Sequence, residues 1–307
     1  MKDKSIVVTG ATGFIGSHLI NKLMEDGEDL LILVRKESDL SRLKDMKDNL
    51  TFMLCSDFLS SPIHDVEGLI HLSTYYRRFH EYSDISKMVD TNITIPSEIV
   101  EKAISFGADF IINTGTFFRY DLSGKVISEE SPVLPYNYYS ATKVSFENVL
   151  DYYCREGLIN AVTLALFSPY GPGDNPTKLI PYIVRSGTNG DPISISGGKQ
   201  MLDFTFVSDI VNAYVKSIEF LRRNSAQEHE IFNIGTGTNH SVDDVLTYLE
   251  EVLGSPLPDV KRDRQSVDSF NVRADISKAS HLLKWSPRVD LKSGIAKMVE
   301  EQKVRQG

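Results

Sequence analysis

The chain has 307 residues, of which 41% are hydrophobic and 24% are charged, and its formal net charge is −9. A length and composition of this kind are expected of a soluble globular protein with about two domains. The negative net charge provides no field that would attract nucleic acid or an anionic membrane, so we expect neither as a partner.

The cysteine and histidine content indicates a protein without a metal site. Cys55 and Cys154 form no C-x-x-C pair, and the seven histidines lack ligand spacings such as H-E-x-x-H. The longest uncharged run, residues 157–173, contains prolines, glycines and polar residues, which is not the composition of a membrane span. The first predicted strand starts too close to Met1 for a signal peptide. We therefore expect a reducing, cytoplasmic location.

A strand is predicted at residues 5–8, followed by a glycine-rich stretch at 9–16 and then by apolar residues at helical spacing. In this order, backbone N–H groups and a helix N-terminus point at an anion. Gly10 permits a tight turn, Gly13 permits the approach of a pyrophosphate, and Gly16 permits close packing of helix and sheet. The spacing is G-x-x-G-x-x-G, and its strand–turn–helix context favours dinucleotide binding over an ordinary flexible turn.

Strand and helix patterns alternate after this stretch, which predicts a doubly wound α/β fold with helices on both faces of a parallel sheet. Further strands are predicted at residues 30–34, 50–54, 68–72, 110–113 and 161–167. Two long helices are predicted at residues 84–106, with a kink at Pro96, and at residues 138–154.

The composition changes after Phe167, where residues 168–176 form a loop rich in proline and glycine. We place a domain boundary there. Residues 1–167 form the dinucleotide-binding domain, and residues 168–307 form mainly a smaller α/β domain, with residues 203–235 returning to the first. The elements predicted beyond the boundary are helices at 179–185, 209–220, 242–253 and 275–284, and strands at 193–195 and 231–234.

The residues after the second predicted strand bear on the choice between NAD and NADP. An acidic side chain there bonds the 2′-hydroxyl of NAD, whereas an arginine accommodates the 2′-phosphate of NADP. The chain has Arg35 and Lys36 at this point, and Ser38 can add a hydrogen bond to a phosphate. Although such a basic pair is often only a solvated surface feature, its position favours NADP(H) over NAD(H), which stays possible. Asp57 and Phe58, just past the third strand, are candidates for contacts with the adenine.

Tyr139 and Lys143 are four residues apart in a predicted helix, so their side chains share one face. A free tyrosine, with a pKa of about 10, is a poor acid–base catalyst at neutral pH, but an adjacent ammonium lowers that pKa by stabilising the phenolate. The Y-x-x-x-K pattern also occurs by chance. Here it follows a strand that ends at residues 113–116, where open α/β sheets place their ligands. We therefore predict that Tyr139 is a general acid–base catalyst, and that Lys143 lowers its pKa and bonds the nicotinamide ribose.

These motifs together resemble the extended short-chain dehydrogenase/reductase family, whose members act largely on nucleotide sugars. The resemblance covers nearly the whole chain. It rests on the glycine-rich stretch, Thr116, Tyr139 and Lys143, and on further residues and segments, namely residues 71–74, Asn92, and residues 167–172, 203–209, 274–279 and 283–287.

The resemblance implies a Rossmann sheet of about seven strands, a smaller C-terminal domain that closes over a nucleotide-diphosphate sugar, and a homodimer that pairs the two long helices of each subunit. It makes Thr116 the hydroxyl that bonds the sugar oxygen, with Thr114 as the alternative. The positions expected to contact the substrate are Thr116, Ser168, Lys178, Leu179 and Arg264. The positions expected to contact the cofactor are Gly10, Thr12, Gly13, Phe14, Ile15, Gly16, Arg35, Ser38, Asp57, Phe58, Leu72, Ser73, Thr74, Asn92, Thr114, Tyr139, Lys143, Phe167 and Pro169.

Departures from the family pattern narrow the expected reaction. Phe117 and Phe118 stand where the sugar-nucleotide 4,6-dehydratases carry an Asp-Glu pair, and the acidic ribose contact typical of the 4-epimerases is missing. Leu202 replaces an arginine that many members place on the diphosphate, so anchoring of the substrate falls to Arg264, with Lys199 as a further candidate. The segments around Thr116, Tyr139 and Leu202 are most similar to the CDP-abequose/CDP-paratose synthase group, which reduces a C4 ketone.

The resulting hypothesis is an NADPH-dependent reduction of the C4 ketone of a nucleotide-linked 4-keto-6-deoxysugar, a reaction of deoxysugar biosynthesis. In this hypothesis Tyr139 protonates the alkoxide that forms as hydride reaches C4. One alternative is a sugar-nucleotide epimerase, which oxidises and re-reduces one carbon with tightly bound NAD(P). The other is a non-catalytic dinucleotide-binding regulator. The sequence specifies neither the nucleotide base nor the sugar.

Overall fold

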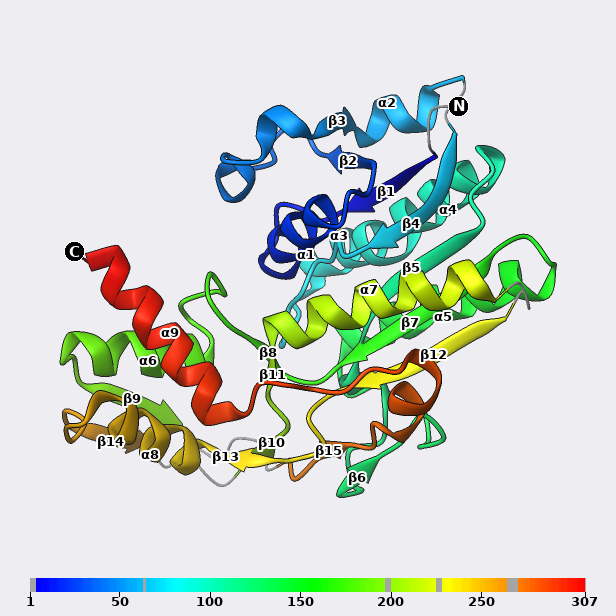
Figure 1. Cartoon of the computed structure of the whole chain (residues 1–307). Helices are drawn as coiled ribbons and strands as arrows, with labels where there is room; N and C mark the ends of the chain where they lie inside the picture. Colours follow the sequence, from blue (N-terminus) through cyan, green and yellow to red (C-terminus); the bar gives the residue numbers. More distant parts are fainter. Residues whose placement is uncertain (1–3, 63–64, 197–199, 225–227, 264–269, 307) are drawn as a thin grey trace. The chain divides into compact units, whose positions relative to one another are not determined.

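The computed structural model describes residues 4–62, 65–196, 200–224, 228–263 and 270–306 (Figure 1). The chain divides into two compact units, each built from three segments. Unit 1 comprises Met1–Asp121, Pro132–Ala165 and Val211–Phe232, and unit 2 comprises Leu122–Ser131, Leu166–Ile210 and Asn233–Gly307. The boundary that we predict after Phe167 lies close to Ala165, where the second segment of unit 1 ends, and the predicted return at residues 203–235 overlaps its third segment.

Seven strands form the central sheet in the order β12-β7-β5-β4-β1-β2-β3. Their bounds are β1 Ser5–Thr9, β2 Leu30–Val34, β3 Thr51–Leu54, β4 Val66–His71, β5 Phe110–Thr116, β7 Asn160–Leu166 and β12 His229–Ile234. β1 pairs in parallel with both β2 and β4, so the strand order reverses beside it. Ligands of open α/β sheets bind at such a reversal, outside the carboxyl ends of the strands. The predicted Rossmann-type fold is confirmed.

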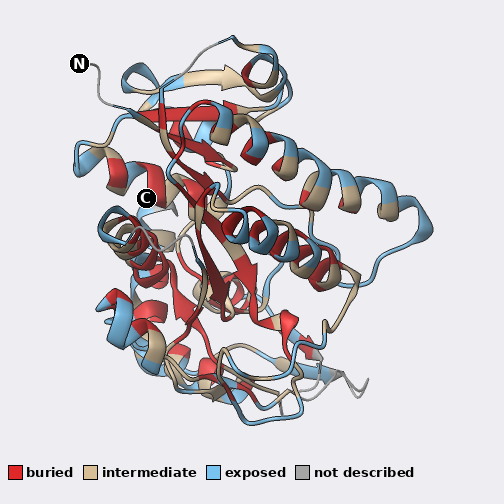
Figure 2. Ribbon diagram, turned by 90° about the vertical axis from the view of Figure 1, so that its right-hand side faces the viewer, coloured by how far each residue is buried: buried red, intermediate tan, exposed pale blue. Residues whose placement is uncertain are grey.

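The strands are apolar on both faces because helices cover both. The helices that accompany the sheet are α1 Phe14–Glu25, α2 Cys55–Ser60, α3 Ile85–Val89, α4 Ile95–Ser105, α5 Tyr138–Arg155 and α7 Val207–Arg223 (Figures 1 and 2). Val7 and Leu69 point to one face, where they share a hydrophobic cluster with residues of α2, α4 and α5. Ile6, Val8 and Ile70 point to the other face by the pleat of the strand, and they are fully buried as well.

The helix predicted at residues 84–106 is interrupted at its middle. It consists of α3, a π-helical turn at Asp90–Thr94 and then α4, with Pro96 in the first turn of α4. A proline inside a helix lacks one N–H donor and clashes with the preceding turn. The kink expected at Pro96 is therefore realised as a π turn just before it, and this turn carries the buried Asn92.

Unit 2 is built from helices and very short strand pairs. Three of its helices are α6 Leu179–Asn189, α8 Val242–Leu253 and α9 Leu291–Gln306. Its strand pairs are β6 Val126–Ile127 with β15 Arg273–Ala274, β8 Pro169–Tyr170 with β11 Thr205–Phe206, β9 Ile193–Ser196 with β14 Val260–Asp263, and β10 Met201–Leu202 with β13 His240–Ser241. α9 packs against α6 and α8. Sequence reasoning missed α9. The helix that it predicted at 275–284 corresponds to a helical segment at residues 277–283, most of which, Ala279–Leu283, is a π turn.

Asp203 is a buried carboxylate that ties three loops of unit 2 together. Its Oδ1 accepts hydrogen bonds from the backbone N and the Oγ1 of Thr236, at 2.7 and 2.6 Å. Its Oδ2 accepts from the backbone N of Gly237 at 2.9 Å and of Ala274 at 3.0 Å. Because both oxygens face only donors in these bonds, the position requires a carboxylate rather than an amide.

Asp209 anchors the segment that follows the π turn of unit 2. Its Oδ2 accepts from the backbone N of Arg288 and of Val289, both at 3.0 Å, and its carbonyl oxygen accepts from the indole of Trp285 at 2.9 Å. The two segments that resemble the family at residues 203–209 and 283–287 are therefore joined to each other through Asp209 and Trp285, which gives both segments a structural role.

The described residues contain neither a candidate membrane span nor a cluster of metal-ligating side chains. No helix there combines the length and the apolar character needed to cross a bilayer. Nor do histidine, cysteine and acidic side chains gather there in groups of three or more that could hold a metal ion.

The Asp203→Asn substitution should destabilise unit 2. The new amide turns an NH2 group toward N–H donors, and unsatisfied buried donors cost about 1–3 kcal/mol. We expect the free energy of unfolding to fall by about 2–3 kcal/mol. Urea unfolding followed by the fluorescence of Trp285, the single tryptophan of the chain, measures this directly in the same unit. The exposed Asp45 provides the control, since Asp45→Asn should leave the curve unchanged. Equal curves for both variants would contradict the role of Asp203.

Candidate active site

The glycine-rich turn between β1 and α1 requires two of its three glycines for its own packing. Gly10 has φ +73°, and a Cβ there would lie 2.5 Å from the backbone N of Ser73. A Cβ at Gly16 would lie 2.2 Å from the carbonyl oxygen of Gly10. Gly13 differs, because its backbone is extended and a Cβ there would meet, among the described residues, only the Gly10 oxygen at 3.2 Å. A methyl group at Gly13 would thus require the Gly10 carbonyl to shift by only a few tenths of an ångström, far less than the clashes at Gly10 and Gly16, which leaves this backbone open to the approach of a ligand.

The N-terminus of α1 offers a favourable place for an anion. The helix begins at Phe14 directly after Gly13, without a capping side chain and without an acidic residue in its first turn. A helix N-terminus carries a partial positive charge and exposes backbone N–H donors. Thr12, Phe14 and Ile15, which we predict to contact the cofactor, are half-buried around this turn. The turn thus fits the pyrophosphate of a dinucleotide.

The residues predicted for the adenosine end lie at the carboxyl ends of β2 and β3. Arg35 is exposed, and its backbone N donates to the Oγ of Ser38 at 2.9 Å. Burial raises the pKa of the Cys55 thiol, and the Arg35 guanidinium opposes this rise. Arg35 is therefore near enough to the first residue of α2 to act on its charge. Asp57 is exposed on α2, whereas the Phe58 ring is fully buried in the core. A contact between Phe58 and a ligand would therefore use its backbone.

The segment after β4 lies against the glycine-rich turn. The backbone N of Leu72 donates to the carbonyl of Thr9 at 3.1 Å, and that of Ser73 reaches the Thr9 hydroxyl at 3.4 Å. Beneath them, a hydrogen bond of 2.7 Å joins the Thr9 Oγ1 to the Nδ1 of His71, and both side chains are buried. The predicted cofactor contacts at residues 72–74 are thus brought beside those at residues 10–16.

Asn92 holds this segment against α5. Its Oδ1 accepts from the backbone N of Tyr75 at 2.8 Å and from the Thr74 hydroxyl at 3.2 Å. Its Nδ2 donates to the carbonyl of Tyr75 and to the Thr142 Oγ1, both at 3.0 Å. All four hydrogen-bonding positions of the amide are therefore used inside the protein. Any effect of Asn92 on a cofactor would act through the segment that it positions.

The helix α5 begins so that Tyr139 lies in its first turn. Asn137 and Ser140 form a capping box, in which each side chain accepts from the backbone N of the other, at 2.9 and 3.0 Å. Tyr139, Lys143 and Glu147 then follow at intervals of four residues on one helix face, and all three side chains are buried.

The electrostatics of this face differ from the expectation. Burial raises the pKa of Tyr139 to about 12, although a hydrogen bond with Thr74 lowers it in part. Burial lowers the pKa of Lys143 to about 8, against the opposing charge of Glu147. The predicted lowering of the Tyr139 pKa by Lys143 is thus not found, because burial disfavours both charged forms. At neutral pH Tyr139 is a phenol, which can donate a proton, and Lys143 is an ammonium.

Lys143 is also the buried polar group that best fits a ligand. Among the described residues its Nζ has no hydrogen-bond partner. Burial and the Lys143 charge hold the pKa of His71 well below its usual range, so this imidazole is neutral. An ammonium with three free donors fits the hydroxyls of a ribose, as predicted for the nicotinamide end of the cofactor.

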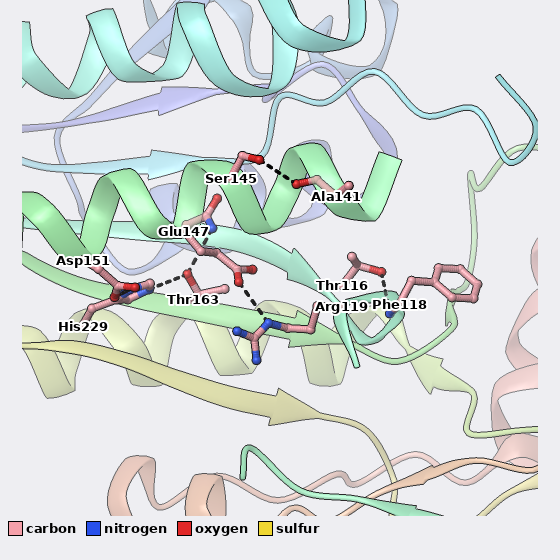
Figure 3. Close-up of polar contacts among 10 residues, drawn as sticks. Thr116, Phe118, Arg119, Ala141, Ser145, Glu147, Asp151, Thr163 and His229 are labelled. Carbon is pink, nitrogen blue, oxygen red and sulfur yellow. Dashed lines mark hydrogen bonds and ion pairs between the residues drawn. The ribbon is translucent and has the colours of Figure 1, made fainter. Parts of the chain in front are cut away.

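Two threonines at the end of β5 differ in how far their hydroxyls are used. Thr114 donates to the carbonyl of His71 at 2.8 Å and shares a 2.5 Å hydrogen bond with the Tyr214 hydroxyl. Thr116 is buried, and its Oγ1 accepts a longer bond of 3.3 Å from the backbone N of Phe118 (Figure 3). Acceptance leaves the Thr116 proton available for donation, so Thr116 is the better candidate for holding a substrate oxygen.

Sequence reasoning missed a buried polar network behind α5. Arg119 Nε donates to Glu147 Oε2 at 2.9 Å, and both side chains are buried (Figure 3). His229 bridges Asp151 and Thr163, with 2.5 Å from its Nδ1 to Asp151 Oδ1 and 2.8 Å from its Nε2 to Thr163 Oγ1. Glu147 could have been predicted from its position one helical turn after Lys143. Its partner Arg119 could not, because it lies in the turn after β5, in another part of the sequence.

Three predicted residues lie where β7 leads into β8. Phe167 is buried, and its backbone N donates to the carbonyl of Ile234 at 2.9 Å. Ser168 has φ +26°, which is rare for a residue with a side chain, and Pro169 begins β8. Unusual backbone geometry of this kind gathers at functional sites.

The remaining predicted substrate contacts lie near the start of α6. Lys178 precedes this helix, and its Nζ forms an ion pair of 2.9 Å with the buried carboxylate of Asp174. Leu179 is the first residue of α6 and is half-buried. Arg264 and Lys199 lie outside the described residues.

Gly13 and Gly16, two glycines of the turn, should respond differently to alanine. Gly13→Ala should change the free energy of unfolding by less than about 1 kcal/mol yet weaken NADPH binding at least about tenfold, because the methyl group meets the ligand. Gly16→Ala should cost about 2–4 kcal/mol in stability without any ligand, because its methyl group meets the Gly10 carbonyl. Fluorescence titration and urea unfolding measure the two effects. Gly124→Ala is the control, since a Cβ there has ordinary contacts of 3.7 Å or more. Unchanged NADPH binding by Gly13→Ala would remove this turn from the cofactor site.

Known proteins share this architecture over its full length. CDP-abequose synthase of Salmonella typhimurium is 28% identical over 305 residues, which cover 96% of this chain and 97% of the relative. UDP-glucose 4-epimerase of Thermotoga maritima, solved with UDP-glucose, has a TM-score of 0.87 at 26% identity and covers 99% of this chain and 100% of its own. UDP-glucuronic acid 4-epimerase of Bacillus cereus, solved with UDP-glucuronic acid and NAD, has a TM-score of 0.85 at 25% identity and covers 98% and 99%.

The names of these relatives are those of sugar-nucleotide enzymes, the class that the glycine-rich turn and the Tyr139–Lys143 face predict. The family model for the NAD dependent epimerase/dehydratase family matches residues 6–235. That range contains the glycine-rich turn, the end of β5 and the Tyr139–Lys143 face of α5. The chain therefore belongs to the NAD dependent epimerase/dehydratase family, whose members are NAD(P)-dependent sugar-nucleotide enzymes.

Proposed function

We propose that this protein reduces the C4 ketone of a nucleotide-linked 4-keto-6-deoxysugar with NADPH. The observation that carries the proposal is the buried face of α5, where a phenol and an ammonium lie one helical turn apart. The phenol of Tyr139 keeps its proton at neutral pH, which is the form that a reduction needs. The similarity to CDP-abequose synthase supports a deoxysugar substrate.

The residues of the chain have the following roles in this reaction. NADPH, when bound, supplies the hydride that adds to C4. Thr116 donates a hydrogen bond to the ketone oxygen, and Tyr139 transfers its proton to the oxygen as it becomes an alkoxide. The Lys143 ammonium bonds the ribose hydroxyls, and the Tyr139 phenolate that remains then recovers a proton from solvent. The oxygen ends as a hydroxyl, and charge and protons balance.

Phe117 and Phe118 support a reductase rather than a dehydratase. Both follow Thr116 directly, and the Phe117 ring is buried while Phe118 stacks on Tyr136 with 5.2 Å between ring centroids. An elimination across C5 and C6 needs an acid and a base beside the sugar. Two phenyl rings supply neither, so the chemistry is limited to the redox step.

The cofactor preference rests on the residues after β2. Arg35 is exposed there, and Ser38 accepts a hydrogen bond from it while keeping its own proton. A guanidinium and a hydroxyl are suited to a 2′-phosphate. We therefore propose NADPH as the cofactor, with NADH as the weaker alternative.

The sugar nucleotide and the assembly complete the proposal. We propose that Ser168, Lys178 and Leu179 contact the nucleotide diphosphate, together with Arg264. The strained backbone of Ser168 supports its part. We propose a homodimer paired through the two long helices of each subunit, as the family resemblance implies, and a cytoplasmic location, as the two unpaired cysteines indicate.

A sugar-nucleotide epimerase is the second candidate, favoured by the similarity to UDP-glucose and UDP-glucuronic acid 4-epimerases. The two functions separate in one assay. A panel of 4-keto-6-deoxysugar nucleotides with CDP, dTDP, UDP or GDP is mixed with NADPH, and the absorbance of NADPH is followed. A reductase consumes one NADPH for each ketone reduced. An epimerase given UDP-glucose changes the sugar and consumes none, which would contradict the proposal.

Removing the acid–base hydroxyl should separate turnover from binding. Tyr139→Phe should lower kcat by about 10²–10⁴-fold, the usual contribution of general acid catalysis, while the Kd for NADPH stays within about threefold. The neighbouring Tyr138, whose ring stacks on His80, provides the control as Tyr138→Phe. Full activity of Tyr139→Phe would exclude Tyr139 from the mechanism.

The basic residue after β2 should discriminate between the two cofactors. Arg35→Ala should raise the Kd for NADPH about tenfold or more, since a charge-assisted bond to phosphate contributes about 1.5–3 kcal/mol, and should leave the Kd for NADH unchanged. Lys44→Ala, at an exposed position, is the control. Equal losses for both cofactors would show that Arg35 does not contact a 2′-phosphate.

A further inference from the structure

A buried ion pair in unit 1 has no part in the proton and hydride transfers proposed above. Arg119 Nε lies 2.9 Å from Glu147 Oε2, and the two side chains are 7% and 2% exposed. Burying two charges costs several kcal/mol, and a buried pair often adds no more stability than apolar residues of the same size. A stabilising role alone is therefore a weak explanation for it.

The pair joins the two elements that carry the proposed reacting groups. Glu147 follows Lys143 by one helical turn on the buried face of α5. Arg119 is the last residue of the short helical turn Phe117–Arg119. Thr116 caps the start of this turn, since its Oγ1 accepts from the backbone N of Phe118 (Figure 3). The sheet leaves room for the carboxylate, because a Cβ at Gly115 would lie 3.3 Å from Glu147 Oε1.

We propose that Glu147 and Arg119 are positioning residues for the cofactor and acid–base site. Glu147 keeps the Lys143 side chain charged, while Arg119 keeps Glu147 ionised and holds the Thr116 turn against α5. This rests on the proposed function only in that Lys143 binds the dinucleotide. It does not depend on which sugar is reduced.

The charges around the pair support this assignment. Lys143 faces Glu147 on its own helix and His71 from β4, and the pKa of His71 is held well below its usual range, so His71 stays neutral. Glu147 faces Arg119, Lys143 and, from β12, His229. Burial raises the pKa of Glu147, and the Arg119 guanidinium is the largest influence that opposes it. Glu147 is thus the negative charge that acts on Lys143.

The pH dependence of NADPH binding tests the proposal without a sugar substrate. The Kd is measured by NADPH fluorescence between about pH 6 and pH 10. In the unchanged protein the affinity should fall above about pH 8, where Lys143 loses its proton. In Glu147→Gln the fall should begin about one pH unit lower, because the charge that stabilises the ammonium is gone. Glu156→Gln is the matched control, since Glu156 is an exposed carboxylate at the end of the same helix.

A merely structural role of Glu147 would weaken binding equally at every pH, and that outcome overturns the proposal. If Glu147→Gln alone fails to fold, the double variant Glu147→Gln/Arg119→Gln leaves no uncompensated charge behind, and its profile should be displaced in the same way. If the folded double variant binds NADPH with an unshifted pH dependence, that result also overturns the proposal. Because binding is the readout, absence of ketone reduction would contradict the proposed function and leave this inference standing.

Discussion

Burial of the Lys143 ammonium is the constraint on which the candidate site depends. An ammonium removed from water is disfavoured by several kcal/mol unless it is paired, and here its pKa is lowered to about 8. The negative charge that opposes this lowering is Glu147, one helical turn away, which is itself held by Arg119 at 2.9 Å. The end of β5 and the face of α5 are therefore coupled by charge, and this coupling brings a protonated phenol, a hydroxyl and a cation into one part of unit 1.

Much of unit 1 could be predicted because its signals are local. A β-branched run, the turn at Gly10 to Gly16 and a helical apolar stripe identify β1 and α1 without reference to the rest of the chain. The packing of these glycines explains why the pattern is specific, since an added methyl group at Gly16 would approach a carbonyl oxygen to 2.2 Å. The family and the order of strands and helices in the sheet could be predicted because their motifs, too, are short segments of contiguous sequence.

The elements that sequence reasoning missed depend on distant partners. α9 has no strong apolar stripe of its own and is held by α6 and α8. The π turn before α4 reflects both Pro96 and the four hydrogen bonds of Asn92, none of which a helical period reveals. The strands that form the short pairs of unit 2 contain only two or four residues each, too few for an alternating pattern.

The candidate site, too, has features that the sequence predicts and features that depend on distant partners. The spacing of Tyr139 and Lys143 is readable from the sequence, but their protonation is not, because burial sets it. The pKa of Tyr139 is raised rather than lowered, and this assigns a proton donor rather than a base at neutral pH. Arg119 is separated from Glu147 by 28 residues, so no spacing rule joins them.

The most direct test follows an isotope from the cofactor to the sugar. NADPH carrying deuterium at both hydrogen positions of nicotinamide C4 is incubated with the protein and a nucleotide-linked 4-keto-6-deoxysugar, and the product is examined by NMR. We expect one deuterium at C4 of the sugar for each NADPH consumed. A product without deuterium at C4, or an altered sugar with no NADPH consumed, would contradict the assignment of a ketoreductase.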